Sequence, residues 1–184
     1  MPPIIRPCSM EDMPELYSVI NNAAEAYKGV IPADCWHTPY MSMQELEREI
    51  ADGVRFSCLE SMRKIQGVTG MQDRGDVALI RHAYVRTEFQ NQGIGSQLLR
   101  NAERIIDKPI LVGTWRAATW AIGFYVKNGY RMLGHEEAEH LLRKYWHVPQ
   151  RQIETSVVLA LESHWPAAPK TKIPAPDDGK IDSS

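Results

Sequence analysis

Cysteine is scarce in this chain, and the few cysteines present follow no binding pattern. The 184 residues include three of them, Cys8, Cys35 and Cys58, with no C-x-x-C spacing. An odd number of scattered cysteines argues against a secreted disulfide framework and against a zinc site. We therefore expect three plain thiols and no bound metal ion.

Long hydrophobic runs and an excess of one charge are also missing. No run approaches the ~18 apolar residues that a membrane span requires, and the first six residues lack the apolar segment of a secretory signal. The 21 Lys and Arg are interspersed with 23 Asp and Glu, which gives a net charge of −2. This balance provides no polycationic face for nucleic acid. We expect a cytoplasmic protein that contacts neither a membrane nor DNA or RNA.

The chain is long enough for one domain with its own hydrophobic core, which we assign to residues 1–163. Its last residues differ in composition. From Pro166 onward there are four prolines, several charges and only two large apolar residues, Ile173 and Ile181. Such a segment buries too little surface to offset the entropy that ordering would remove. We expect residues 164–184 to form a disordered tail.

Hydrophobic periodicity predicts alternating strands and helices within the domain. Strands are predicted over residues 4–6, 54–60, 64–72, 77–85, 109–112, 130–133 and 155–161. Helices are predicted from the Ser9 cap to about Tyr27 and over residues 42–51, 94–106, 117–128 and 136–146. The three strands between residues 54 and 85 are separated only by turns, which favours an antiparallel meander. The predicted fold is an α/β single domain with a mixed, mostly antiparallel sheet of about seven strands, flanked by helices.

The most informative segment is Gln90-x-x-Gly93-x-Gly95, which lies between a strand ending at Val85 and a helix. Two glycines let the backbone N–H groups converge on an anion, and the helix adds its free first-turn donors and positive dipole end. The loop therefore suits a diphosphate. A P-loop would need Lys after Gly95, and a dinucleotide fold would need a third glycine where Leu98 stands, so both are excluded.

A second segment, Ala121-Ile122-Gly123-Phe124-Tyr125-Val126-Lys127-Asn128-Gly129-Tyr130, follows downstream. Together the two segments resemble GNAT-type N-acetyltransferases, whose loop reads Gln/Arg-x-x-Gly-x-Gly/Ala and whose later signature reads A-x-x-F-Y-x-K-x-G-F/Y. The resemblance extends more weakly over about residues 3–162. It implies acetyl-CoA as cosubstrate, a sheet that splays where this donor inserts, and direct transfer of the acetyl group to a primary amine.

The resemblance also implies which residues hold the donor. The diphosphate would be bound mainly by backbone N–H groups of the loop, with two side-chain amides beside them. The family often has Asn three residues before the alanine of the second motif, where this chain has Ala118, so the resemblance implies no side-chain contact from this position to the pantetheine arm. The full set comprises Ala83, Tyr84, Val85, Gln90, Asn91, Gln92, Gly93, Ile94, Gly95, Ser96, Ala118, Ala121, Phe124 and Lys127.

The catalytic acid implied by the resemblance is Tyr125, whose phenol, with an ordinary pKa of about 10, suits protonation of a thiolate. The alternative is a core aromatic paired with its neighbour. The glutamate base of some family members is absent, because Leu79 stands at its position. His82 is the nearest group that titrates near neutrality, and the alternative is a half-buried structural histidine. Strict alternation puts Arg81 on the opposite face of the strand, but a bulge would change the face that His82 meets.

Acceptor recognition is expected from the irregular segment between the first two helices. Its aromatic and acidic side chains, Tyr27, Asp34, Trp36 and Tyr40, suit a cationic amine through cation–π and Coulomb attraction. Arg81 would bind an acidic group of the acceptor or form an ordinary ion pair. The alternative is a loop anchored to the core by its own aromatics. The acceptor itself, a small molecule or a peptide amine, is left open.

Three other functions remain open at this stage. The chain could transfer a longer acyl group, bind CoA as a regulatory module without turnover, or be an interaction domain that binds no CoA. A homodimer is also predicted, through the final strand and the helix over residues 136–146. In that helix the stripe of Leu141, Leu142 and Tyr145 could equally cover the core of its own chain.

Overall fold

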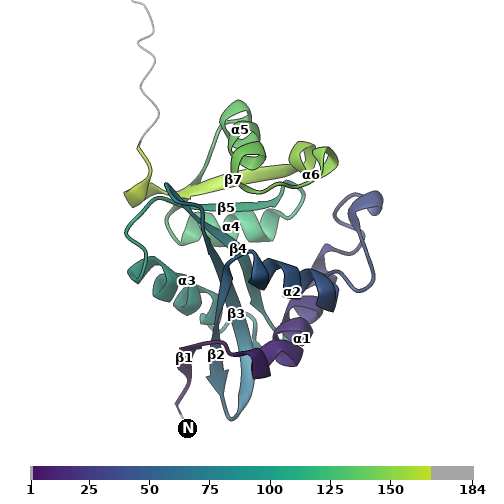
Figure 1. The fold of residues 1–184 in the computed structure, drawn as a ribbon, viewed down its shortest axis with the longest axis vertical. Helices are drawn as coiled ribbons and strands as arrows, with labels where there is room; N and C mark the ends of the chain where they lie inside the picture. Colours follow the sequence, from purple (N-terminus) through teal and green to yellow (C-terminus); the bar gives the residue numbers. More distant parts are fainter. Residues whose placement is uncertain (1, 167–184) are drawn as a thin grey trace, which may run out of the picture.

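A computed structural model describes residues 2–166 and shows a single seven-stranded sheet in the order β1-β2-β3-β4-β5-β7-β6 (Figure 1). Only the β4–β5 pair is parallel. The strands are β1 Ile4–Pro7, β2 Val54–Ser61, β3 Lys64–Asp73, β4 Ala78–Val85, β5 Ile110–Trp115, β6 Tyr130–Met132 and β7 Ser156–Leu161. The helices are α1 Met13–Ala24, α2 Met43–Ala51, α3 Ile94–Arg104, α4 Thr119–Lys127, α5 His135–Tyr145 and α6 Gln150–Thr155. The predicted fold class is thereby confirmed.

The helices cover both faces of the sheet. Helix α3 packs over Gly67 of β3, whereas the next residue, Val68, packs with α1 and α2 on the opposite face. On β5, Val112 joins the core cluster of α3 and α4, and Leu111 joins that of α5. Successive residues of a strand point to opposite faces, so α3 and α4 form one layer and α1, α2 and α5 the other.

The sheet opens between its two central strands. Strand β4 pairs with β5 only from Ala78–Ile110 to Ile80–Val112, and β5 then continues along β7. In Figure 1, β5 and β7 cross the sheet while β3 and β4 run down from them. Beyond Ile80, the side of β4 that faces β5 has no strand partner within residues 2–166. The chain therefore has the splayed sheet that the sequence predicts.

A β-bulge lies where the two strands part. Gly70 of β3 pairs with His82 and Met71 pairs with Ile80, which leaves Arg81 as an extra residue in β4. A bulge changes the face to which the following side chains point. Both Arg81 and His82 contact Glu49 of α2. The strict alternation predicted for residues 77–85 is therefore wrong at Arg81, and the alternative with a bulge is present.

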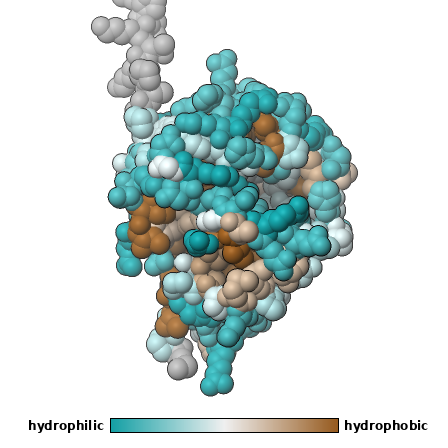
Figure 2. Space-filling model, in the orientation of Figure 1, coloured by the Kyte–Doolittle hydropathy of each residue, from teal (hydrophilic) through white to brown (hydrophobic). Residues whose placement is uncertain are grey.

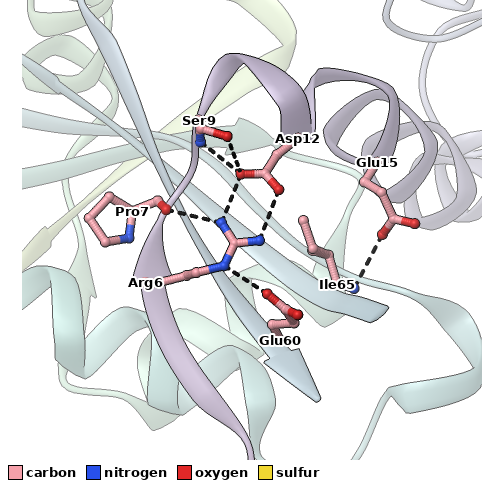
Figure 3. Close-up of polar contacts among 7 residues, drawn as sticks. All are labelled: Arg6, Pro7, Ser9, Asp12, Glu15, Glu60 and Ile65. Carbon is pink, nitrogen blue, oxygen red and sulfur yellow. Dashed lines mark hydrogen bonds and ion pairs between the residues drawn. The ribbon is translucent and has the colours of Figure 1, made fainter. Parts of the chain in front are cut away.

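The N-terminal strand is held by a cluster of charges (Figure 3). The Arg6 guanidinium donates two hydrogen bonds to the Asp12 carboxylate, at 2.8 and 2.9 Å, and a third to Glu60 at 2.7 Å. The backbone N–H of Ser9 also donates to Asp12, at 2.7 Å. This cluster joins β1, β2 and the start of α1.

One helix in the second half of the chain differs from the prediction, and two further observations there concern the predicted homodimer. Helix α6 was not predicted, because its six residues are too few for a helical pattern to be recognised. The final strand, β7, lies between β5 and β6 and has no free edge for a second subunit. The stripe of α5 is buried against the chain's own core. The predicted homodimer would thus need surfaces other than these two.

The described chain continues past residue 163, the predicted end of the domain. Residues Glu162–His164 form a 3₁₀ turn, and Trp165 packs against the core cluster of α5. The rest of the predicted tail, residues 167–184, lies outside the described residues. No helix in the described part of the chain is long and apolar enough to span a bilayer. The face shown in Figure 2 is mostly hydrophilic, with hydrophobic side chains in small separate patches.

Candidate active site

The loop before α3 has the geometry of an anion site. Gly93, the N-cap of α3, has φ +77°, and Asn91 has φ +62°. A left-handed backbone at Gly93 turns the chain into the helix, and glycine adopts it without strain. Among residues 2–166, no carbonyl or side-chain acceptor binds the N–H groups of residues 91–96. These donors are therefore available to a ligand at the positive end of α3.

Gly95 brings the two sequence motifs together. A Cβ added at Gly95 would lie 3.1 Å from two ring atoms of Phe124 and 3.7 Å from the Val85 side chain. The α3 terminus therefore approaches α4 more closely than a larger residue would readily permit, whereas the contact of such a Cβ with Val85 of β4 would be an ordinary one. Gly93, by contrast, has no neighbour within 4 Å of the same position and is required for its φ alone.

The other predicted donor-binding residues have varied environments. Ala83, Tyr84 and Val85 pair with β3 and lie at the end of β4 that has no strand partner on its β5 side among the described residues. Gln90 donates through Nε2 to the carbonyl of Val85 at 3.2 Å, so one of its amide hydrogens is bonded to the end of β4. Ala118 is fully buried among the aromatics of the acceptor loop and presents no surface. Ala121 and Phe124 are half-buried, Lys127 is exposed on α4, and Gln92, Ile94 and Ser96 contribute loop amides.

A cavity of about 440 Å³ lies on the face of β4 that carries His82 and Tyr84. Its walls come from the segment after α1, from α2, β4 and β5, and from α5 and α6. Six predicted residues line it: Tyr27, Asp34, Tyr40, Arg81, His82 and Tyr84. Trp36 does not, but its ring packs against Tyr40 with centroids 5.6 Å apart. The structure thus brings the predicted acceptor residues and the predicted base to one cavity.

Three tyrosines, Tyr27, Tyr40 and Tyr84, line this cavity. The indole N–H of Trp115 donates to the Tyr40 hydroxyl at 2.9 Å, and the Tyr27 and Tyr40 rings lie 5.5 Å apart. Burial raises the pKa of Tyr27, and it raises that of Tyr84 well above its ordinary value. The negative charges that Tyr27, Tyr40, Tyr125 and Glu49 would carry when ionised add to the effect on Tyr84. These hydroxyls therefore stay neutral and can donate hydrogen bonds.

Asp34 lies at the rim of the cavity. Its carboxylate pairs with Arg151 of α6 at 3.0 Å, and both side chains are more than half exposed. The pair connects the irregular loop to a helix that sequence reasoning did not predict. A solvent-exposed pair contributes little to stability, and both of its residues line the cavity.

Glu49 is the functional residue that the sequence analysis missed. Its carboxylate, 22% exposed, lies between Arg81 and His82, with Oε1 3.1 Å from the Arg81 guanidinium and Oε2 hydrogen-bonded to His82 Nε2. Burial raises the pKa of Glu49, but the hydrogen bond and charge of His82 and the charge of Arg81 outweigh it and leave the pKa below its ordinary value. Glu49 follows the buried Leu46 by three residues, and that spacing places it on the inner face of α2.

Tyr125 does not line the cavity. It is 6% exposed on α4, edge-on to Phe124 at 5.2 Å and to Tyr130 at 5.7 Å, in a core cluster against which Ala83 packs. Burial raises the pKa of Tyr125. The Tyr125 ring therefore packs on the face of β4 that Ala83 meets, which is opposite to the face that carries His82.

The fold and the loop define an acyltransferase of the GNAT class. The family model described as an acetyltransferase (GNAT) domain matches residues 21–145. The chain therefore belongs to the GNAT acetyltransferase family. A search of curated protein sequences found no match.

Solved structures share this fold at low identity. The PaiA N-acetyltransferase of Thermoplasma acidophilum in complex with coenzyme A is 20% identical, covers 87% of this chain and 98% of its own, and gives a TM-score of 0.66. The ribosomal-protein-S18-alanine N-acetyltransferase of Escherichia coli is 16% identical with a TM-score of 0.63, and the coverage is 92% and 98%. A GNAT acetyltransferase of Elizabethkingia anophelis with acetyl-CoA bound is 20% identical with a TM-score of 0.59, and the coverage is 86% and 97%.

Proposed function

We propose that the protein transfers an acetyl group from acetyl-CoA to a primary amine. The observation that carries this proposal is the row of unpartnered loop amides of residues 91–96 near the end of β4, where the sheet opens. The cavity lined by His82 of the same strand lies beside this opening. Solved structures with the same fold contain coenzyme A or acetyl-CoA, which supports the choice of donor.

Donor binding would combine two features of the chain. The amides of residues 91–96 and the α3 terminus would hold the diphosphate. The unpaired edge of β4 after Ile80 offers backbone groups to the pantetheine arm, which carries amides of its own. When bound, acetyl-CoA supplies the acetyl group as a thioester. The opening exists because β5 leaves β4 after Val112 and continues only along β7.

His82 and Tyr125 would then handle the protons. His82 takes one proton from the acceptor ammonium, and the freed lone pair on nitrogen attacks the acetyl carbon. The carbon–nitrogen bond forms, the carbon–sulfur bond breaks, and the Tyr125 hydroxyl gives its proton to the departing sulfur. The second proton of the amine nitrogen restores Tyr125, and His82 releases its proton to solvent. Sequence reasoning found both residues, and neither requires a covalent intermediate.

The cavity favours a small acceptor that carries its amine at one end. Its aromatic side chains suit the ammonium group. Arg81 and Arg151 also line the cavity, and each is already paired with a carboxylate of the chain, so an acidic group of the acceptor would share these partners. The Asp34–Arg151 pair belongs to the cavity lining. Cytoplasmic location and a homodimer remain predictions.

Ligand-dependent melting together with an amine panel tests the proposal. Acetyl-CoA at 100 times its dissociation constant should add ~2.7 kcal/mol of stability and raise the melting temperature by about 5 to 10 °C. With a suitable amine, release of free CoA should exceed the rate without protein. Stabilisation without turnover on any amine would favour a regulatory module, and no stabilisation would favour an interaction domain. Faster transfer from a longer acyl-CoA would revise the donor.

Replacement of the predicted acid tests the chemical step. Tyr125→Phe should lower kcat on the order of 10²-fold while the affinity for acetyl-CoA is kept, because only the proton donor is lost. Tyr17→Phe on α1 removes a hydroxyl from a half-buried tyrosine outside the cavity and should leave kcat unchanged. Equal rates for Tyr125→Phe and the parent would remove Tyr125 from the mechanism.

A further inference from the structure

We propose that Glu49 is the positioning residue of the catalytic base: it fixes His82 in the tautomer that presents Nδ1 to the acceptor amine. This inference rests on the proposed acetyl transfer and assigns a role to a residue on α2, 33 positions before His82. Three observations support it: the two contacts of the carboxylate, the unpartnered Nδ1 atom, and the orientation of the imidazole ring.

Both oxygens of the Glu49 carboxylate have charged or polar partners. Oε1 accepts from Arg81, and Oε2 is bonded to His82 Nε2. Arg81 is itself held, because its second terminal nitrogen donates to Gln72 at 3.2 Å, and the buried Gln72 donates to the Asp52 carbonyl at 2.9 Å. The bulge at Arg81 makes this possible by bringing both side chains to the same carboxylate. Glu49 is therefore fixed from two directions.

The second ring nitrogen of His82 has no partner. His82 is 6% exposed, and Nδ1 is buried without a hydrogen bond to any residue between 2 and 166. An ionised carboxylate can only accept, so the bond to Glu49 places the proton of a neutral imidazole on Nε2. Nδ1 then carries a lone pair and can accept a proton.

The ring orientation gives the direction in which Nδ1 points. A Cβ on Gly70 of β3 would lie 2.9 Å from His82 Cδ2, so that edge of the ring lies over β3. Nδ1 and Cδ2 are on opposite edges of an imidazole. Nδ1 therefore faces away from β3, toward the side where β4 and β5 diverge. The Phe56 ring stacks on the imidazole at 5.2 Å and 27°, which restricts its rotation.

The charged and titratable groups near His82 come from three elements. Glu49 belongs to α2, Arg81 and Tyr84 to β4, and Tyr40 to the loop before α2, while β2 and β3 contribute the uncharged Phe56 and Gly70. Burial raises the pKa of both tyrosines, so they stay neutral. An imidazolium formed at His82 is therefore stabilised by the Glu49 charge, as the carboxylate of a Ser-His-Asp triad stabilises its histidine. Nδ1 is covered by neighbouring side chains, which the acceptor must displace to reach it. The proton then moves from the ammonium to Nδ1, and the Nε2 proton stays in place.

Glu49→Gln gives a sharp test because Arg81 determines how the new amide must lie. The Arg81 donor requires the amide oxygen, so the amide NH₂ faces Nε2 and forces the imidazole proton onto Nδ1. Nitrogen NMR of the His82 ring, assigned with His82→Gln, should show Nε2–H in the parent and Nδ1–H in the variant, without any acetyl-CoA. The Glu47→Gln variant removes the same charge from the exposed face of α2 and should leave the parent tautomer.

Kinetics provide the second measurement. Glu49→Gln should lower kcat by at least 10²-fold and leave the acceptor KM within about twofold, and the acidic limb of its pH profile should move to lower pH. Glu49→Asp, which keeps the charge, should recover part of the rate. An Nδ1–H tautomer in the parent, or an unchanged kcat and pH profile in Glu49→Gln, would overturn the inference. If no amine is acetylated, the proposed function fails, and the NMR result still decides the role of Glu49.

Discussion

Gly93 and Gly95 act differently although they are two residues apart. Gly93 is needed for its left-handed backbone, and Gly95 for the space that the Phe124 ring occupies. The first requirement belongs to the turn itself, and the second to the contact between α3 and α4. A single motif thus combines a local constraint with a tertiary one.

Replacement of Gly93 separates backbone strain from ligand binding. Gly93→Ala should lower the free energy of unfolding by about 1 kcal/mol, because an L side chain is strained at φ +77°. The same substitution at Gly53, which has φ +97° and open space around it, should destabilise the fold similarly. Calorimetry should show weaker acetyl-CoA binding only for Gly93→Ala. Equal acetyl-CoA affinity in both variants would argue against diphosphate binding by this loop.

Individual site residues differed in how readily the sequence predicts them. The loop glycines and Tyr125 belong to contiguous motifs, and His82 is the one histidine on the central strand. Glu49 is distant in sequence from His82, and its role depends on a bulge at Arg81 that leaves no residue signature in β4. Periodicity places a side chain on a face, but it does not show which distant side chain meets it.

Helix α2 controls where Glu49 lies. It has nine residues, and Leu46 is its one buried residue. Its start is fixed by a capping box, in which the Ser42 hydroxyl accepts from the Glu45 N–H at 3.2 Å and the Glu45 carboxylate accepts from the Ser42 N–H at 2.9 Å. A short helix with one apolar anchor depends strongly on such a cap.

Loss of the cap should therefore affect catalysis as well as stability. Ser42→Ala should lower the free energy of unfolding by about 1 kcal/mol. It should also reduce kcat severalfold, because fraying of the first turn loosens the helix that carries Glu49. Urea unfolding and steady-state kinetics give the two values. Gln44→Ala, a change at an exposed residue of the same turn, is the control. Loss of stability in Ser42→Ala with an unaltered kcat would show that the cap does not hold Glu49 in place.

The elements that the sequence predicted well are those with long patterns and clear ends. Ser42 and Gly53 bracket α2, and Gly129 follows α4 at φ +89°, as predicted from their turn chemistry. Helix α6 was not predicted from the sequence because Gln150–Thr155 contains only Ile153 as a buried residue. Burial of that single side chain among the residues of α5 and β7 stabilises it, and this packing is invisible in a local window.

The charge cluster at the N-terminus makes the stability of the whole molecule depend on pH. Hydrogen bonds from Arg6, then from the Ser9 backbone and hydroxyl, hold the pKa of Asp12 below its ordinary value despite the opposing effect of burial. The folded state therefore binds a proton less readily than the unfolded state. This stabilisation is present above the ordinary Asp pKa of about 4 and is lost as pH falls below it.

The Asp12→Asn variant mimics the protonated state. At pH 7 it should be less stable than the parent by about 1 kcal/mol, a modest value because the Arg6 side chain is a third exposed. Urea midpoints measured between pH 7 and pH 2 should converge as the pH falls below about 4. Asp107→Asn, at an exposed aspartate, serves as control. Parallel curves for Asp12→Asn and the parent over the whole range would contradict this assignment.

The two halves of the sheet meet along a short seam. Strands β1 to β4 form one antiparallel ladder and β5, β7 and β6 another, and only three residue pairs from Ala78–Ile110 to Ile80–Val112 join them. A small rotation about these three pairs would change the width of the opening between β4 and β5 and leave the pairing within each ladder intact. The donor would lie inside this opening and contact both halves of the sheet. Donor binding would then restrict the rotation and fix the distance between the acid on α4 and the base on β4.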